Sequence, residues 1–558
     1  MKKYLFIALA ALGFAACTEK GEDNAPIQNA ELEESYIAIN LMAADNDTRA
    51  AEDTYGYEEG TTAERAIKTA YFFFFDENGN PFNVVGGPET APGATAPGGG
   101  KNHLSLIIGD TTGKVDPNVS DIKNAVLVLN TYKGVYPSKI VAVLNWTPED
   151  KAYSLKDLHD ELASLGNDTN GYVMSNSVYM DGANKMVDAT PLTADNIKTS
   201  STDALASPVN IYVERIAAKV VLTASGKVAE TDNIFKLRNE TPFKPVGGSD
   251  IEVYMQLHGW ELYNDYSTSS LIKNINTEWS ADDLGLTWND SPYYRCYWAM
   301  SQSSELNDSF SWSYTSGGTT NYGFAVGSAT YCGENTNGET LRTKVILKGQ
   351  LMQKNGDNYE PLEIASWYGN EYAGEQALRT AVANSLKYTL YSSTDGTSFS
   401  SIEPEDLQCV AGAKVGAQAY EVGFQLSTDG QSKTWYQYSS ANGYQPLGAI
   451  DSDENKTATN AYLKSVEPAL LYTQGMTYYT VDIKHLGATG KIAEYGVVRN
   501  HVYQIDIESI KGYGSPVFSG LSNIETPEFP EKYTDSYVAA RINVLSWKVV
   551  KQGVDIVQ

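Results

Sequence analysis

The sequence predicts a mainly β protein built from two β-sandwich domains with a few short helices. Short runs of alternating apolar and polar side chains recur along the chain, separated by turn residues, as in sandwich proteins. The 38 Tyr and 47 Gly residues fit this class, because strands favour aromatic side chains and turns favour glycine. A chain of 558 residues is too long for one hydrophobic core, so we expect one domain at residues 50–225 and another at 226–536.

The N-terminus has the pattern of an export signal. A basic pair precedes an apolar run at residues 4–14 that is too short to span a bilayer. The following order, FAAC at residues 14–17, resembles a bacterial lipobox. We therefore expect a signal peptide at residues 1–16, cleavage between Ala16 and Cys17, and acylation of Cys17, which tethers the chain to a membrane by its lipid. The alternative is an ordinary secretory signal with an incidental cysteine.

Residues 18–34 are polar and acidic and are expected to form a flexible tether, which is followed by a short strand and a loop open to proteolysis. Residues 35–43 predict a strand whose apolar face carries Ile37, Ile39 and Leu41. In the polar loop after it, residues 44–60, Arg49 is the only basic residue. An isolated arginine in an exposed acidic loop is a target for a trypsin-like protease, although a solvated charge is the usual alternative. Arg65, directly before the next strand, is a competing site.

The predicted elements of the first domain are strands with one clear helix. We expect the strands at residues 66–76, 104–109, 125–130, 139–145, 178–181 and 209–225. The helix is expected over residues 154–165, with Ser154 as its N-cap and Asp157 three residues on. Its apolar stripe consists of Leu155, Leu158, Leu162 and Leu165.

The second domain is again rich in strands. Strands are expected at residues 251–257, 343–351, 419–426, 478–483 and 501–507, with a helix near 374–385. The tail, residues 537–558, opens with a further strand. Ala540, Ile542, Val544 and Ser546 occupy one of its faces, and Arg541, Asn543, Leu545 and Trp547 occupy the other. An apolar strand on a free tail needs a partner, either in its own domain or in a neighbouring molecule's sheet.

No pattern of catalytic residues stands out. The five histidines have no paired metal-ligand spacing, and there is no GxSxG elbow or P-loop, so we predict neither an enzyme nor a metal or other cofactor. The net charge of −28 argues against a nucleic-acid partner. The sequence leaves two alternatives for the other cysteines. Cys296 and Cys332 form a disulfide, or Cys296, Cys332 and Cys409 are all buried free thiols.

The order of several motifs resembles the type V pilins of Bacteroidales, most closely the major subunits of their short fimbriae. The motifs are the lipobox, YIAINLMAADNDTRA (36–50), KIVAVLNWTP (139–148), VERIAAKV (213–220), TKVILKGQL (343–351), EYGVVRNHVYQIDI (494–507) and YVAARINVLSW (537–547). Spread from residue 14 to residue 547, they extend the resemblance over nearly the whole chain. Long Tyr- and Gly-rich loops, such as residues 314–333, depart from the family pattern.

The resemblance implies a way of assembly. Both domains would be transthyretin-like sandwiches, and residues 17–49 would be a lipidated propeptide carried to the outer membrane. An Arg-specific protease would cut after Arg49 and leave Ala50 as the new N-terminus, removing a placeholder strand that bears Ile37, Ile39 and Leu41. A donor strand from the tail of the next subunit would take its place, and head-to-tail pairing of this kind gives a filament. Its donor residues would be Ala540, Ile542, Val544, Leu545 and Trp547.

The function implied is therefore the shaft subunit of a surface fimbrium that supports adhesion or biofilm formation. Its partners would be further copies of the chain, anchor and tip or accessory subunits, the protease and a receptor that the sequence does not identify. One alternative is an accessory or tip adhesin of the same system. Another is a surface glycan-binding lipoprotein, whose aromatic side chains would stack on sugars, although such side chains more often fill a sandwich core.

Overall fold

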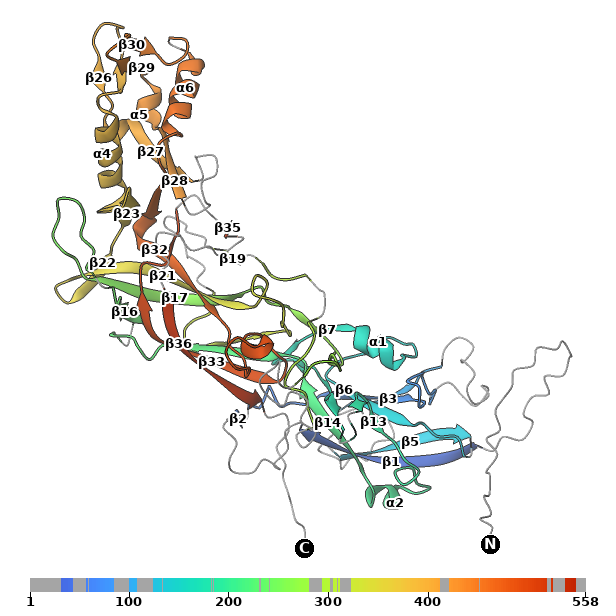
Figure 1. The fold of residues 1–558 in the computed structure, drawn as a ribbon. Coiled ribbons are helices and arrows are strands. Elements are labelled where there is room, and N and C mark those ends of the chain that lie inside the picture. The colour runs from blue at the N-terminus through green and yellow to red at the C-terminus, as the bar shows by residue number, and fades with distance from the viewer. Residues whose placement is uncertain are drawn as a thin grey trace, which may run out of the picture.

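The computed structural model describes residues 32–43, 57–58, 60–84, 100–107, 124–132, 134–181, 183, 185–229, 232–239, 241–280, 294–301, 305–308, 310–311, 323–411, 421–450, 452–518, 523–524 and 537–547. The chain is elongated, with a sheet of N-terminal strands at one end and a lobe of helices and short strands at the other (Figure 1). The predicted class, mainly β with a few short helices, is confirmed.

The N-terminal sheet has the strand order β4-β3-β6-β10-β14-β1-β5, with β13 paired to β6. Its strands are β1 (Leu32–Ala43), β3 (Thr69–Phe75), β4 (His103–Ile107), β5 (Asn124–Tyr132), β6 (Lys139–Leu144), β10 (Met174–Asn176), β13 (Thr190–Pro191) and β14 (Val209–Arg215). Strand β3 is apolar on both faces because both faces of this sheet are covered. Phe72 and Phe74 join one core, and Phe73 and Phe75 join the other.

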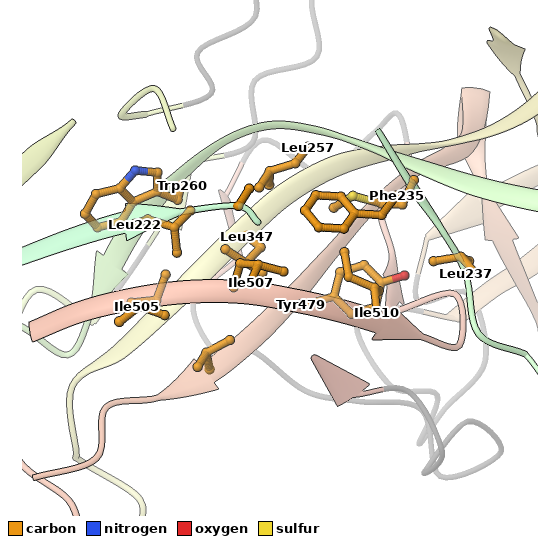
Figure 2. Close-up of a cluster of buried hydrophobic side chains, with 14 of the residues drawn as sticks. Leu222, Phe235, Leu237, Leu257, Trp260, Leu347, Tyr479, Ile505, Ile507 and Ile510 are labelled. Atoms are coloured by element: carbon orange, nitrogen blue, oxygen red, sulfur yellow. The ribbon is translucent and has the colours of Figure 1, made fainter. Parts of the chain in front are cut away.

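The central sandwich packs a five-stranded sheet on a six-stranded one. The first has the order β2-β36-β33-β15-β20, and the second has the order β16-β17-β21-β32-β34, with β22 paired to β21. Ile505 and Ile507 of β33 face Leu257 of β17 and Leu347 of β21 in the core between the sheets (Figure 2). The strands are β2 (Tyr57–Glu58), β15 (Ala218–Thr223), β16 (Ile234–Lys236), β17 (Val253–Tyr263), β20 (Ala329–Cys332), β21 (Lys344–Asn355), β22 (Asn358–Pro361), β32 (Met476–Asp482), β33 (His501–Lys511), β34 (Ser515–Pro516) and β36 (Tyr537–Trp547).

The segment between β22 and β32 forms a separate outer lobe, at the top of Figure 1. It contains two sheets, of order β24-β23-β31-β28-β27 and β26-β25-β29-β30. Its strands are β23 (Ile364–Trp367), β24 (Asn370–Tyr372), β25 (Leu390–Ser393), β26 (Ser400–Ser401), β27 (Leu407–Ala411), β28 (Glu421–Leu426), β29 (Thr434–Ser439), β30 (Gly443–Pro446) and β31 (Ala469–Tyr472). Its helices are α4 (Gly374–Leu386), α5 (Thr428–Gln431) and α6 (Asp453–Leu463), of which α4 confirms the predicted helix.

Short elements complete the described chain. The remaining helices are α1 (Leu155–Asp160) and α2 (Ser201–Leu205), with single 3-10 turns η2 (Pro404–Asp406), η3 (Thr473–Gly475) and η4 (Ile492–Glu494). The two-stranded pairs are β7 (Leu162–Ser164) with β18 (Thr268–Ser270), β8 (Gly166–Asn167) with β9 (Gly171–Tyr172), β11 (Tyr179–Met180) with β12 (Met186–Val187), and β19 (Phe310–Ser311) with β35 (Asn523–Ile524).

The predicted helix over residues 154–165 is correct at its start and wrong in its length. Ser154 caps α1 as expected, accepting a hydrogen bond from the Asp157 N–H while the Asp157 carboxylate accepts one from the Ser154 N–H. The helix ends at Asp160, and the next residues pair with β18 as β7. Leu162 is consequently 39% exposed, so its place in the apolar stripe does not bury it. A strand partner distant in sequence outweighs the local helical pattern.

The predicted single strand over residues 209–225 is also wrong. It is divided into β14, in the N-terminal sheet, and β15, in the central sandwich. Between them, the Ile216 N–H donates to the Val173 carbonyl at 3.0 Å, and the Ala217 carbonyl accepts from the Asn500 N–H at 2.8 Å. Because these backbone groups bond outside both ladders, the chain passes from one sheet to the other at this point.

Buried ion pairs lie near this crossover. Lys273 contacts Glu214 of β14 at 3.1 Å, and Arg499 contacts Glu334 at 2.7 Å, all four side chains being almost fully buried. Buried charges of this kind are tolerated only when paired, so these residues fix how the segments around β14 and β33 pack. Cys296, Cys332 and Cys409 are buried free thiols, with no disulfide among them. No helix within the described ranges is long and apolar enough to cross a membrane.

Candidate functional site

Strand β1 is an interior strand of the N-terminal sheet. It runs parallel to β14 on one side, from Ile39 opposite Val209 to Ala43 opposite Val213. On the other side it runs antiparallel to β5, from Leu32 opposite Tyr132 to Asn40 opposite Asn124. The first part of β1 thus pairs with β5 and the last part with β14, the two ladders overlap at Ile39 and Asn40, and β5 joins the sheet through β1.

The three apolar side chains predicted for β1 all point into one core. Ile37, Ile39 and Leu41 are at most 2% exposed and pack in a cluster with β3, β5, β6 and β14. The polar Asn40 lies on the opposite face, where its Nδ2 donates to Asn210 Oδ1 at 3.0 Å. The strand is therefore held by a backbone ladder on each side and by an apolar face beneath.

Strand β36 lies in its own chain's central sandwich. It pairs antiparallel with β33 from Tyr537 opposite Lys511 to Ser546 opposite His501, with a bulge between Ile507 and Ser509. On its other edge, the described part of the chain supplies the two residues of β2, which run parallel to the end of β36. The tail strand thus packs on its own domain in the single chain, one of the two outcomes that the sequence left open.

The donor residues predicted from the sequence occupy defined places on this ladder. Ala540, Ile542 and Val544 are the register partners of Ile507, Ile505 and Tyr503, which belong to the central core. Leu545 and Trp547 lie at the end of the strand, opposite Val502 and beside Glu58 respectively. The ladder thus places Ala540, Ile542 and Val544 in register with core positions of β33.

The remaining predicted sites fall outside the described residues. These are the signal cleavage pair, Ala16 and Cys17, with Cys17 also the predicted lipidation site, and the predicted propeptide junction, Arg49 and Ala50. They stay predictions. Within the described part of the chain, no three His, Cys, Asp or Glu side chains are grouped as metal ligands.

Arg65, the competing cleavage site, lies in a tightly bonded turn. Its N–H donates to the Thr61 carbonyl, and the following Ala66 N–H donates to Ala63. On either side, the Glu64 carbonyl accepts two hydrogen bonds from Arg215, and the Ala66 carbonyl accepts one from Asn145. The peptide groups before and after the Arg65–Ala66 bond therefore both take part in hydrogen bonds.

The Glu64 carboxylate fixes the same turn to the rest of the fold. It contacts Lys219 of β15 at 3.0 Å and accepts hydrogen bonds from Tyr331 of β20 at 2.5 Å and from the Thr61 N–H at 2.6 Å. We call Glu64, Arg215, Lys219 and Tyr331 the Glu64 clamp. No sequence pattern indicates the clamp, because a glutamate next to an arginine is typical of an exposed charged pair, and its partners on β14, β15 and β20 are distant in sequence.

The surroundings of Glu64 favour the ionised form of its carboxyl group. Burial disfavours the charge on Glu64, but the hydrogen bonds from Tyr331, Thr61 and Lys219 outweigh it and lower the pKa of this carboxyl group. Burial lowers the pKa of Arg215 to about 9, which still leaves the guanidinium charged at neutral pH. The clamp is thus a buried network of paired charges and hydrogen bonds.

The C-terminal part of the chain matches a known family. Residues 470–553, which contain β32, β33 and β36, match the family described as major fimbrial subunit protein type IV, fimbrillin, C-terminal. The match includes two of the motifs on which the resemblance was based, EYGVVRNHVYQIDI and YVAARINVLSW. No curated protein sequence matches the chain.

Similar solved structures also come from fimbrial proteins. They include a fimbrilin (FimA) from Porphyromonas gingivalis, at 13% identity and a TM-score of 0.36, covering 93% of this chain and 98% of that one. They also include the tip fimbrial protein Mfa3 from the same species with a C-terminal truncation, at 10% identity, a TM-score of 0.26 and coverage of 92% and 100%. A fimbrial assembly protein from Parabacteroides distasonis has 11% identity, a TM-score of 0.26 and coverage of 73% and 100%. The predicted resemblance to Bacteroidales fimbrial subunits is confirmed.

The clamp predicts that Arg65 resists proteolysis. A protease must draw the scissile segment into an extended form, which here requires breaking the clamp. Trypsin should therefore leave the Arg65–Ala66 bond of the folded precursor intact, and Glu64→Ala should speed cleavage there by about tenfold or more, because it removes the contacts of the Glu64 carboxylate with Lys219, Tyr331 and Thr61 that hold the turn. Mass spectrometry of the new N-termini over a time course measures both rates.

A matched control is Glu149→Ala, which removes a glutamate whose side chain is 75% exposed. Its rate of cleavage at Arg65 should equal that of the unchanged precursor. Equal rates for Glu64→Ala and the unchanged precursor would show that the clamp does not protect this bond.

Proposed function

We propose that the chain is the shaft subunit of a surface fimbrium and that β1 is a placeholder replaced by a neighbour's tail strand. In this proposal the precursor is acylated at Cys17, reaches the outer membrane as a lipoprotein, and is cut after Arg49 by an Arg-specific protease. The interior position of β1, paired on both edges and just upstream of Arg49 in sequence, is the observation that carries the proposal.

Loss of β1 would be costly unless another strand replaced it. The side chains of Ile37, Ile39 and Leu41 leave an apolar cluster, which at about 1.5 to 3 kcal/mol each gives roughly 5 to 9 kcal/mol. The facing edges of β14 and β5 also lose their backbone partners, and unpaired edges bind other strands readily. A groove of this kind selects an extended segment with apolar side chains at every second position.

The tail strand has the required pattern. Ala540, Ile542 and Val544 follow the same two-residue spacing as Ile37, Ile39 and Leu41. The tail leaves β33 in one subunit and enters the groove of the next, so each subunit offers one strand and one groove. Such heterologous pairing continues indefinitely and produces a filament. An accessory or tip subunit needs the groove but no donor strand, so the eleven-residue β36 favours a shaft subunit.

Cleavage should control assembly. Trypsin-treated precursor is expected to form a ladder of polymers on unboiled gels, while Arg49→Ala and a chain lacking residues 539–558 should both stay monomeric. The first variant keeps the placeholder in its groove, and the second lacks the donor. Mixing cleaved, tail-deleted chains with cleaved, unchanged chains should shorten the ladder. Normal polymers from Arg49→Ala would show that the cut lies elsewhere, and cleavage at Arg49 without any polymer would argue against a shaft subunit.

A reversible disulfide between β33 and β36 tests whether β36 is the donor strand. Gln504 of β33 and Asn543 of β36 are register partners, so Gln504→Cys with Asn543→Cys places two thiols at a spacing suited to a disulfide. The oxidised precursor should be cleaved yet stay monomeric, because β36 cannot leave β33. Reduction should restore the ladder, which makes the same protein its own control. Polymers formed by the oxidised variant would show that β36 is not the exchanged strand.

A further inference from the structure

The four-stranded sheet of the outer lobe carries a cluster of aromatic rings on one face. Tyr391 lies opposite Tyr436, and Tyr438 lies opposite Tyr444, so all four belong to the same face. Phe399, directly before β26, stacks on Tyr444 with ring centroids 3.8 Å apart and ring planes within 5°. We call these five residues the aromatic platform.

The platform faces away from the core of its lobe. The residues that alternate with it along the strands, Leu390 and Trp435, are fully buried in that core. Tyr438 and Tyr444, by contrast, are 38% and 37% exposed, whereas Tyr436 is buried at 6% and supports the exposed rings from below. In the described part of the chain, the hydroxyl groups of Tyr391, Tyr438 and Tyr444 have no hydrogen-bond partner in the protein. The platform therefore offers both ring surface and unused hydroxyl groups to solvent.

The rings hold each other in place. Tyr444 lies at the centre, with ring centroids 5.0 Å from Tyr391 and 4.9 Å from Tyr438 in addition to its stacking on Phe399. Tyr436 supports Phe399 edge-on at 5.1 Å. Rings fixed in this way lose little conformational entropy when a ligand binds, which is why tyrosine is common in binding surfaces.

The sheet that carries the platform has no charged residue. Its strands have the sequences LYSS, SS, TWYQYS and GYQP, in a chain where 20% of residues are charged and the net charge is −28. The face that carries the rings has hydroxyl groups but no cation from these strands, so it cannot neutralise an anionic ligand. The ligand that matches this chemistry is uncharged and combines apolar C–H faces with many hydroxyl groups.

We propose that the aromatic platform binds neutral oligosaccharides. A pyranose ring presents a flat C–H face that covers an aromatic ring, while its hydroxyls reach the tyrosine O–H groups at the edge. Proline-rich peptides need slots between aromatic rings. Here the centroid separations of 3.8 to 6.0 Å bring the rings into contact with each other, so they form a surface rather than slots.

The platform's position suits a ligand outside the molecule. In Figure 1 its strands β26, β29 and β30 lie at the top of the outer lobe, whereas β36 lies in the central sandwich and β1 at the opposite end of the molecule. Binding at the platform thus needs no part of the strand exchange proposed above. The two proposals can fail independently, because the platform is tested on the uncleaved monomer.

The experiment uses the purified, uncleaved precursor on an array of neutral gluco-, manno- and galacto-oligosaccharides with sialylated sugars and proline-rich peptides alongside. Neutral oligosaccharides should bind in preference to the other two. Calorimetric titration with the best neutral oligosaccharide should show that Tyr438→Ala weakens binding about tenfold or more, as expected for an aromatic contact residue. Tyr438→Phe should have a smaller effect because it keeps the ring.

The matched control is Tyr368→Ala, which removes a 65% exposed tyrosine from a turn of the same lobe outside the platform. It should bind like the unchanged protein, and equal thermal midpoints should show that all variants are folded. The proposal is overturned if no neutral oligosaccharide binds or if Tyr438→Ala binds as well as the unchanged chain. Preference for sialylated sugars or proline-rich peptides, or dimers that Tyr438→Ala abolishes, would also overturn it.

Discussion

An interior strand forms backbone hydrogen bonds with a neighbouring strand on each edge. In the N-terminal sheet β1 is such a strand, and β14 and β5 both depend on it for a partner. Among the described strands, β1 lies between β14 and β5, so the outermost strand β5 is attached to the sheet through it. The apolar face of β1 also completes the core beneath the sheet. Backbone pairing and burial thus coincide in the twelve residues of β1, so the same segment stabilises both the sheet and the core beneath it. The same coincidence makes its place one that only another alternating strand could fill.

The Glu64 clamp limits how far any change in the N-terminal segment can spread. Glu64 bonds to β14, β15 and β20, which belong to two different sheets. The chain after residue 60 is therefore fixed to the crossover between the N-terminal sheet and the central sandwich. A strand that lies before the clamp could be exchanged while the cores behind it stay packed. Buried ion pairs hold segments together firmly, because breaking such a pair is strongly destabilising.

The outer lobe separates recognition from assembly in the two proposals. It has its own core, built on Leu378, Val382, Phe424 and Trp435, and it projects from the central sandwich between β22 and β32. An inserted lobe with an independent core tolerates surface variation without disturbing the sheets that hold β1 and β36. Its uncharged aromatic face contrasts with a chain whose overall charge is strongly negative.

The sequence by itself determined the features that depend on neighbouring residues. The alternation of Ile37, Ile39 and Leu41 predicted a strand with one buried face, and Ser154 with Asp157 predicted a helix start, because both patterns act within a few residues. Only the tertiary structure decided where distant segments meet. It ended α1 at Asp160 by giving the next residues a strand partner, divided residues 209–225 between two sheets, buried Glu64 against Arg215, and gathered Tyr391, Tyr438 and Tyr444 from three strands. These contacts arise from pairing across many residues, and a local pattern carries no information about which distant strand supplies the partner.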